Sequence, residues 1–377
     1  MAKNEIKNHI EYDVGDLKDV LKEIYVADPS IVTAIWGPPG IGKTEIHAQI
    51  CAENNWKLAD VRLAHFDPIE LKGIPVRDGD TSKWLIPDLW PQEKDGPCIL
   101  FLDEFSNAPP SVQNVALQLL CEKRLHNYFV PPEVRIAIAG NRDEDGGFVN
   151  KIGLPTANRM MHFKAKTSFK GVEKYWATLK GDKAFRPEIL NFLDHRQELL
   201  HDIEKAQNDQ NCLAFPTPRT WEKLSHLLNR ISVTRGNKGV SKRDVEMYAA
   251  GLVGQGPALE FSNFMEYWVK VRPDKIILEG ELPKFDDSEV GLMYAATGAV
   301  SDYFTNKLGK TGMTKLEPKH AKNFLKFVET LPAEYQVRTF MKCDWEHNPN
   351  HLKACTVHAA EIYDRFGPSV RKLITQK

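Results

Sequence analysis

A glycine-rich run, set between an apolar segment and a helical one, is the feature that most constrains how this chain folds. It consists of Gly37, Pro38, Pro39, Gly40, Ile41, Gly42, Lys43 and Thr44, which match the G-x-x-x-x-G-K-T pattern of a phosphate-binding loop. Apolar residues 31–36 predict a buried strand before it, and a helix is predicted from Glu45 to residue 54. The glycines let backbone N–H groups surround phosphate oxygens, and the helix start adds positive partial charge. These eight residues and Glu45 are the predicted nucleotide-binding set, in which Lys43 contacts the β- and γ-phosphates and Thr44 holds Mg²⁺.

Two more predicted strands end in polar side chains. Residues 98–102 are an unbroken apolar run, typical of a parallel strand covered on both faces, and Asp103 and Glu104 follow it directly. Residues 134–139 form a similar run, and Asn141 comes shortly after it. In an open α/β sheet, ligands bind at the carboxyl ends of the strands. We therefore expect Asp103 to hold Mg²⁺, Glu104 to polarise the water that attacks the γ-phosphate, and Asn141 to orient that water.

These three motifs resemble the Walker A, Walker B and sensor 1 motifs of AAA+ ATPases. Residues 103–113 are similar to the MoxR-like branch, in which an acidic pair, an Asn/Arg-Ala turn and a helix rich in Gln and Leu follow one another. The resemblance covers about residues 15–270. It implies ATP and Mg²⁺ as cofactors.

Two arginines are assigned through the same resemblance. Residues 154–160 resemble the arginine-finger segment of the MoxR-like branch, and residues 216–219 resemble its sensor 2 segment. The resemblance implies that Arg159 completes the site of a neighbouring subunit and that Arg219 reaches the γ-phosphate of its own subunit. Guanidinium groups suit both roles because hydrolysis builds negative charge on the phosphate. The acid that usually precedes the finger is Asn158 here. From the residues alone, Arg159 also fits a surface cation, and Arg219 fits a solvated cation in the first turn of a helix.

The predicted fold class is α/β: an AAA+ P-loop core with a five-stranded parallel sheet, followed by an α-helical lid and a small helical C-terminal region. Strands are predicted at residues 31–36, 58–63, 99–102, 134–139 and 160–163. Helices are predicted at residues 14–25, 172–179, 187–206, 219–231 and 244–253. The predicted domains are residues 1–166 for the nucleotide-binding core, 167–272 for the lid and 273–377 for the C-terminal region.

Composition narrows the possible functions. The chain has 377 residues, 42% of them hydrophobic, which is enough for a substantial core and two or three domains. Its net charge of −1 produces no global field that attracts nucleic acid. No stretch approaches the ~20 apolar residues of a membrane span, and the first ten residues contain no apolar signal region. Six cysteines without framework spacing predict reduced thiols, so we expect a soluble, cytoplasmic protein.

Residues 67–91 contain a predicted hairpin that turns at Asp78 and Gly79. In ring ATPases, loops in this part of the fold line the central pore. Trp84 therefore either contacts a protein client or packs beneath the hairpin.

Two features of the C-terminal region also have alternative interpretations. Cys343, His347, His351 and Cys355 are spaced by four, with ligand types that suit zinc. They lack a C-x-x-C pair, and Pro349 interrupts the helix that would align them, so structural packing is predicted. Lysines cluster between residues 307 and 326, where a solvated helix face is predicted and a nucleic-acid patch is the alternative.

Taken together, the residues and the resemblance predict an ATP hydrolase of MoxR-like type that remodels or matures protein clients. It is expected to assemble with itself into a ring, with a hexamer as the expected size, and to bind neither nucleic acid nor membranes. The resemblance also implies a partner that carries a von Willebrand factor A domain. The alternative is a DNA-associated AAA+ motor, similar to the motor subunit of a modification-dependent restriction system or to a helicase loader. GTP is disfavoured because no N-K-x-D guanine signature stands where one is needed.

Overall fold

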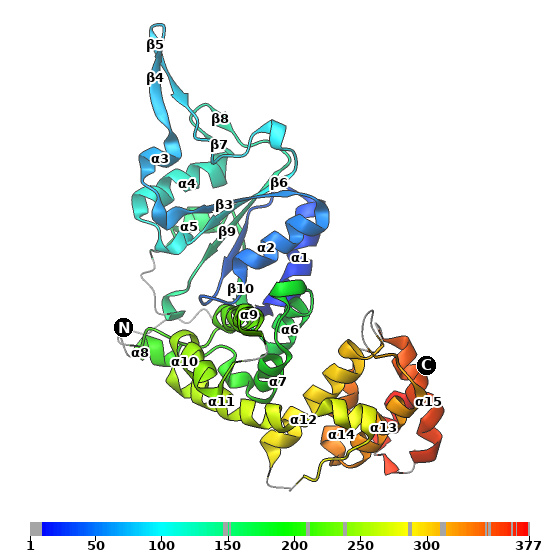
Figure 1. Cartoon of the computed structure of the whole chain (residues 1–377). Coiled ribbons are helices and arrows are strands. Elements are labelled where there is room, and N and C mark those ends of the chain that lie inside the picture. The colour runs from blue at the N-terminus through cyan, green and yellow to red at the C-terminus, as the bar shows by residue number, and fades with distance from the viewer. Residues whose placement is uncertain are drawn as a thin grey trace. The chain divides into compact units, whose positions relative to one another are not determined.

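The computed structural model describes residues 10–145, 150, 152–208, 212–236, 240–285, 289–309, 314–343, 345, 348–362, 365–366 and 368–375 (Figure 1). The chain divides into two compact units. The first is formed by Met1–Thr178 and Leu200–Thr220, and the second by Leu179–Leu199 and Trp221–Lys377. All residues predicted for the nucleotide site belong to the first unit.

A six-stranded sheet forms the centre of the first unit, in the order β1-β10-β2-β9-β6-β3, with every neighbouring pair parallel. The strands are β1 (Glu11–Asp13), β2 (Thr33–Trp36), β3 (Lys57–Arg62), β6 (Cys98–Asp103), β9 (Val134–Gly140) and β10 (Met161–Lys166). The five predicted strands are all present, and the three-residue β1 is added at the edge beside β10. The predicted α/β fold class is therefore confirmed, with one strand more than expected.

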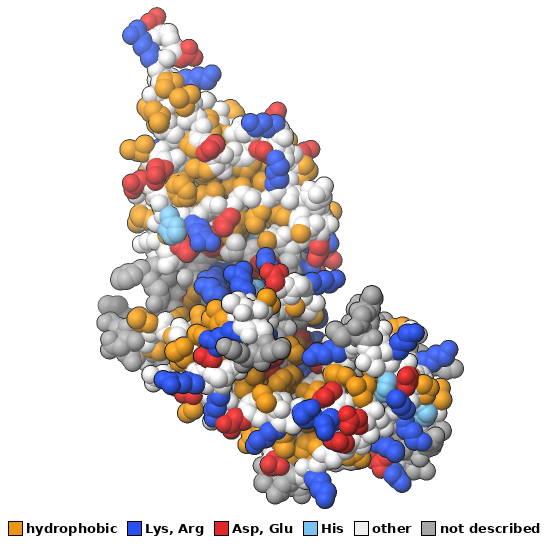
Figure 2. All heavy atoms as spheres, viewed as in Figure 1, with side chains coloured by type: hydrophobic (Ala, Val, Ile, Leu, Met, Phe, Trp, Pro, Cys, Tyr) orange, Lys and Arg blue, Asp and Glu red, His pale blue; other side chains and the backbone are white. Residues whose placement is uncertain are grey.

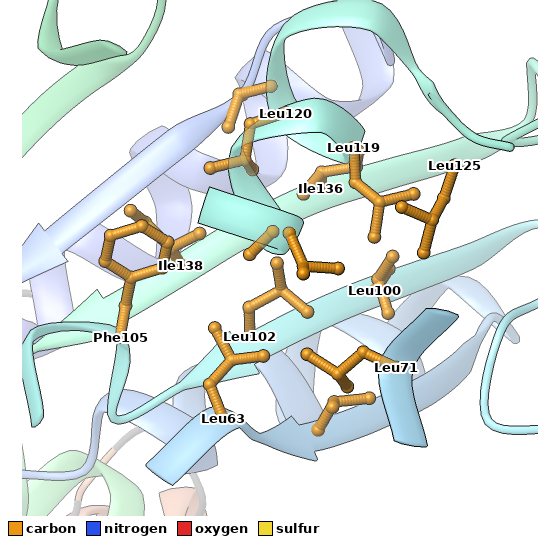
Figure 3. Packing of buried hydrophobic residues seen from close by; sticks show 14 of the residues in the cluster. Leu63, Leu71, Leu100, Leu102, Phe105, Leu119, Leu120, Leu125, Ile136 and Ile138 are labelled. Atoms are coloured by element: carbon orange, nitrogen blue, oxygen red, sulfur yellow. The ribbon is translucent and has the colours of Figure 1, made fainter. Parts of the chain in front are cut away.

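Side chains of the central strands alternate between two buried clusters. On β6, Ile99 and Phe101 join α1 (Val14–Ala27) and α2 (Lys43–Asn54) on one face of the sheet. Leu100 and Leu102 join α4 (Pro110–Glu122) on the other face (Figure 3). Because both faces are covered by helices, the strand needs apolar residues throughout, which explains its unbroken apolar sequence.

Two hairpins extend from the second of these faces. The chain between β3 and β6 forms the short helix α3 (Pro68–Lys72) and the hairpin of β4 (Ile74–Asp78) and β5 (Thr81–Leu85), which turns at Gly79 and Asp80. The hairpin of β7 (Arg124–Leu125) and β8 (Tyr128–Phe129) follows α4. Trp84 of β5 stacks on His126 between β7 and β8, with the ring centroids 4.0 Å apart. Ile74 and Leu85 form a cross-strand pair and are 63% and 57% exposed, and Figure 2 shows apolar side chains gathered at the base of this hairpin.

The first unit is completed by three short helices, α5 (Leu154–Ala157), α6 (Phe169–Trp176) and α8 (Glu204–Asn208). Helix α9 (Pro218–Arg235) begins there and continues into the second unit. The second unit is helical in its described part and contains α7 (Pro187–His195), α10 (Lys242–Val253), α11 (Gln255–Lys270), α12 (Val290–Asp302), α13 (Pro318–Glu329), α14 (Ala333–Met341), α15 (Pro349–Ile362) and α16 (Pro368–Thr375).

One predicted helix is wrong. Residues 187–206 were expected to form one helix, but α7 ends at His195 and α8 begins only at Glu204. Arg196 leaves the helical conformation, and the chain turns so that Leu199 and Leu200 are buried. The carbonyl of Leu199 also accepts a hydrogen bond from the buried indole of Trp221 at 2.7 Å. Burial of these two leucines outweighs continuation of the helix.

Helix α7 is joined to α14 and the residue after it by half-buried charges. The carboxylate of Asp194 pairs with Arg338 and, at 2.9 Å, with Lys342. The Arg338 guanidinium also lies 4.3 Å from the centre of the Tyr294 ring on α12. Since α7 lies in the predicted lid and both α12 and α14 in the predicted C-terminal region, these contacts tie the two regions within one unit.

None of the helices in the described residues has the length and apolar character of a membrane span. The Cys343 thiol donates to the carbonyl of Thr339 at 3.3 Å, and a His351 ring nitrogen lies 3.1 Å from the carbonyl of Leu308. His347 lies outside the described residues, so the interpretation of these residues as structural packing stays a prediction.

Candidate functional site

The glycine-rich loop joins the end of β2 to the start of α2. Gly40 and Gly42 have φ angles of +79° and +100°, which residues with a Cβ rarely adopt. A Cβ on Gly40 would also lie only 2.9 Å from the Thr217 side chain. The loop returns close to β9, where the Gly37 N–H donates to the Gly140 carbonyl at 3.2 Å. The glycines are therefore required by backbone conformation and by close approach, as expected of a loop whose N–H groups face a ligand.

The Lys43 ammonium lies at the centre of the loop. Its Nζ donates to the carbonyls of Gly37 and Pro38 at 2.6 and 2.9 Å, and to Asn141 Oδ1 at 3.1 Å. Burial lowers the pKa of Lys43 to about 8, although the negative charge of Asp103 acts in the opposite direction. A partly desolvated ammonium whose direct partners among the described residues are neutral oxygens favours the binding of an anion. The structure thus brings the predicted loop lysine and the predicted water-orienting Asn141 together.

Thr44 and Asp103 meet at the start of α2. The Thr44 hydroxyl donates to Asp103 Oδ2 at 3.0 Å, while Asp103 Oδ1 accepts the N–H of Glu104 at 2.8 Å. Glu104 has a φ of +55°, an uncommon conformation for a residue other than glycine. Such strain often occurs where a side chain must be held in one direction. A hydroxyl and a carboxylate oxygen this close together fit the oxygen ligands that Mg²⁺ takes, so both residues suit the predicted metal role.

Ser106 also belongs to this site, although no sequence motif indicated a role for it. It is buried, and its hydroxyl accepts the backbone N–H of Asn141 at 2.9 Å. A Cβ on Gly140 would lie 2.7 Å from this hydroxyl and 2.6 Å from the Trp36 ring. The acidic end of β6 and the polar end of β9 are therefore fixed to each other by one serine. A hydroxyl two residues after Glu104 was the only available sequence signal.

Residues 33–149 match the family model of the AAA domain (dynein-related subfamily). The chain contains an AAA+ ATP-hydrolase core. The matched segment includes the glycine-rich loop, the Asp103-Glu104 pair and Asn141, and it ends before both predicted arginines. The binding of ATP by a P-loop is established by this match together with the loop geometry.

A search of curated proteins finds no match. Among solved structures, this chain aligns with NtrX from Brucella abortus at 18% identity and a TM-score of 0.36, over 62% of this chain and 54% of that one. NtrX in complex with ADP aligns at 14% identity and a TM-score of 0.38, over 92% and 70% of the two chains. A mutant of RuvB from Thermotoga maritima aligns at 11% identity and a TM-score of 0.36, over 67% and 70%. The chain thus spans about half the length of the first NtrX structure, and similarities this weak establish no shared activity or partner.

Three buried side chains form a hydrogen-bonded chain that connects the start of α2, directly after the glycine-rich loop, to α1 and β2. A ring nitrogen of His47 lies 2.8 Å from the Lys43 carbonyl, and its other nitrogen lies 3.1 Å from the Tyr25 hydroxyl. That hydroxyl also contacts the Thr33 hydroxyl at 2.6 Å. Burial lowers the pKa of His47 to about 4, so this imidazole is neutral at physiological pH. These residues link α1, β2 and the first turn of α2. The sequence pattern did not indicate them, because each is an isolated polar residue that belongs to no motif.

The two predicted arginines, Arg159 and Arg219, occupy different parts of the first unit. Arg219, which is exposed, is the second residue of α9, and its backbone N–H donates to the Gly40 carbonyl at 3.3 Å. A ring nitrogen of His201 contacts the neighbouring Pro39 carbonyl at 3.3 Å. Residues 200–220 therefore contact the phosphate loop directly. Arg159 is also exposed but lies between α5 and the first residue of β10.

Proposed function

We propose that this chain is a MoxR-like AAA+ ATPase that assembles into a ring and uses ATP hydrolysis with Mg²⁺ to remodel or mature protein clients. A von Willebrand factor A domain protein is the proposed partner, on the family resemblance alone. The proposal rests on the P-loop site and on the position of Arg159 relative to that site.

The position of Arg159 is the observation that carries the ring assembly. Met161, the first residue of β10, is in register with Thr33, at the start of the strand that leads into the glycine-rich loop. Arg159 therefore lies at the amino-terminal edge of the sheet, whereas Lys43 and Asp103 lie near its carboxyl edge. Thr33 and Trp36 are the first and last residues of β2, so about 10 Å of strand, three steps of ~3.3 Å, lies between this edge and the start of the glycine-rich loop. An arginine at that edge is better placed to serve another subunit than its own.

The proposed roles of the site residues follow from their contacts. Lys43 binds the β- and γ-phosphates, and its ammonium exchanges neutral carbonyl partners for anionic ones. Glu104 accepts a proton from the attacking water, which Asn141 orients. Thr44 and Asp103 would hold Mg²⁺, which supplies positive charge against the phosphates. Arg219 from the same subunit would neutralise the charge that develops on the γ-phosphate.

The β4–β5 hairpin is the proposed client-contacting element. Trp84 is engaged with His126, which supports the packing alternative for this residue. Ile74 and Leu85 are instead the exposed apolar pair on the opposite face of the hairpin. We therefore assign client contact to that pair, with Trp84 holding the hairpin in place.

A mixed-subunit experiment tests the proposal. Subunits carrying Arg159→Ala keep Glu104, and subunits carrying Glu104→Gln keep Arg159. Each variant alone should hydrolyse ATP at least 100-fold more slowly than the wild type. A mixture should recover activity, and the wild-type rate per subunit should rise with protein concentration as rings form. Arg124→Ala, which removes another exposed arginine of this unit, is the matched control and should leave the rate unchanged.

Two results would contradict the proposal. Mixed rings verified by native mass measurement but inactive at every ratio would exclude a trans role for Arg159. Hydrolysis by Glu104→Gln at nearly the wild-type rate would exclude Glu104 as the base. The same Glu104→Gln protein, held in its ATP-bound state, is the bait for identifying protein clients, and recovery of DNA instead would favour the DNA-associated alternative.

A further inference from the structure

Trp36, the last residue of β2, is connected by hydrogen bonds to the segment that carries Arg159. Its indole Nε1 donates to His162 Nδ1 at 2.9 Å, and the two rings are stacked with centroids 6.0 Å apart. The other ring nitrogen of His162 lies 2.7 Å from the carbonyl of Ala157. Ala157 is the last residue of α5, two residues before Arg159. One side chain of β10 thus links the strand before the phosphate loop to the finger segment.

The chemistry of the three groups allows only one arrangement of protons. An indole N–H is a donor only, so His162 Nδ1 must accept. The other nitrogen then carries the proton and donates to the Ala157 carbonyl, which is an acceptor only. Both ring nitrogens are therefore used, and the imidazole is fixed in position and in tautomer by its two partners.

The Trp36 indole also packs against the end of β9, next to the predicted nucleotide site. A Cβ on Gly140 would approach the indole to 2.6 Å, so the ring packs directly on the backbone that precedes Asn141. Asn141 in turn contacts the Lys43 ammonium through its side chain and Ser106 through its backbone. Any shift of the Asn141 backbone on hydrolysis would press on Trp36 and, through His162, on the carbonyl of Ala157.

We propose that Trp36 and His162 are positioning residues that couple the nucleotide state of one subunit to the placement of the Arg159 it offers to the next. This inference rests on the proposed trans role of Arg159. Neither residue belongs to the predicted nucleotide-binding set. Trp36 and His162 therefore act on the rate of hydrolysis in the neighbouring subunit. Residues that only supported the glycine-rich loop would act on the rate in their own subunit.

The experiment uses mixed rings of two kinds of subunit. The donor carries Glu104→Gln and provides an intact Arg159, and the acceptor carries Arg159→Ala and provides the working site. Trp36→Phe, which keeps a ring but removes the indole N–H, is placed either in the donor or in the acceptor. In the donor it should lower the mixed-ring rate about fivefold, the factor that one net hydrogen bond is worth. In the acceptor, whose own finger is absent, the change should stay below twofold.

Two further variants make the test specific. His162→Phe keeps a ring of similar size and removes both hydrogen bonds, so it should reproduce the donor effect if Trp36→Phe folds poorly. Trp90→Phe is the matched control, since the buried Trp90 indole makes a comparable hydrogen bond to the Leu71 carbonyl at 2.9 Å. In the donor it should leave the mixed-ring rate unchanged. Nucleotide dissociation constants, measured for each variant, should stay within twofold of the parent subunits.

The outcomes separate this inference from the proposed function. Inactivity of the parent mixture would refute the trans role of Arg159, and this inference with it. An active parent mixture in which donor variants have no effect would refute the coupling alone. Equal losses in donor and acceptor, or weaker nucleotide binding in both, would mean that Trp36 and His162 only pack the core, and would also overturn it.

Discussion

Nucleotide affinity should fall as the pH rises through 8, because the ammonium of Lys43 is easier to deprotonate before phosphate binds. Burial lowers the pKa of Lys43 from 10.5 to about 8, a difference that corresponds to about 3 kcal/mol against the charged form. Phosphate oxygens next to the ammonium favour its charged form and raise the pKa again. Binding is therefore accompanied by proton uptake, so the affinity is fully present below pH 8 and is lost above it.

The magnitude follows from the fraction of Lys43 that is protonated before binding. This fraction is about 90% at pH 7 and about 10% at pH 9. The dissociation constant of a non-hydrolysable ATP analogue should therefore rise about tenfold over this range, or about 1.4 kcal/mol. At pH 8, about half a proton should be taken up per nucleotide, measured by titration calorimetry in two buffers of different ionisation enthalpy.

Two variants control for other groups. Lys123 also has a pKa lowered by burial to about 8, so Lys123→Gln removes a second group that titrates in this range. The pH dependence should persist in that variant. Lys43→Arg carries a permanent charge, so any nucleotide binding it retains should be insensitive to pH. A constant affinity from pH 7 to 9 in the wild type, with no proton uptake, would refute the assignment of Lys43 as a buried phosphate ligand.

Three further predictions address the site and the C-terminal region. Ser106→Ala should lower kcat about fivefold to tenfold with little effect on nucleotide affinity, because it releases the Asn141 backbone, and a loss of affinity alone would contradict this. Metal analysis of untagged protein should find well under one zinc per chain, whereas stoichiometric zinc that is lost with Cys343→Ser would reverse the packing prediction. Duplex DNA should not stimulate ATP hydrolysis at physiological salt, and strong stimulation that collapses when Lys319 and Lys322 are changed to Gln would promote the DNA-associated alternative.

Much of the core could be predicted because several independent patterns agree. The unbroken apolar sequence of β6 follows from burial on both faces, and the glycine-rich loop needs a strand before it and a helix after it. The polar residues Asp103 and Asn141 could then be assigned to one edge of the sheet by topology alone. The short strand β1 was missed because three residues carry no recognisable periodicity.

The supporting residues could not be predicted, for a different reason. His47, Ser106 and His162 are single polar side chains whose partners are distant in the sequence, and a one-dimensional pattern does not contain those pairings. The break after α7 depends likewise on the burial of Leu199 and Leu200, a tertiary effect that overrides helical periodicity. The division into residues 1–166, 167–272 and 273–377 stays a prediction, as do the roles of the site residues.

The ion pairs between α7 and α14 have a consequence for synthesis on the ribosome. Asp194 emerges about 140 residues before Arg338 and Lys342, which corresponds to roughly 7–30 s at ~5–20 residues per second. The first unit can be completed once Thr220 has emerged, whereas the half-buried carboxylate of α7 must wait for Arg338 and Lys342 before it is paired. During that interval Phe192 of α7 can already pack on Trp221, Phe261 and Phe264, whereas the carboxylate of Asp194 still lacks the two cations of the α14 region. A chain truncated at residue 272 would keep these contacts of Phe192 but would leave the Asp194 carboxylate permanently without its two cations.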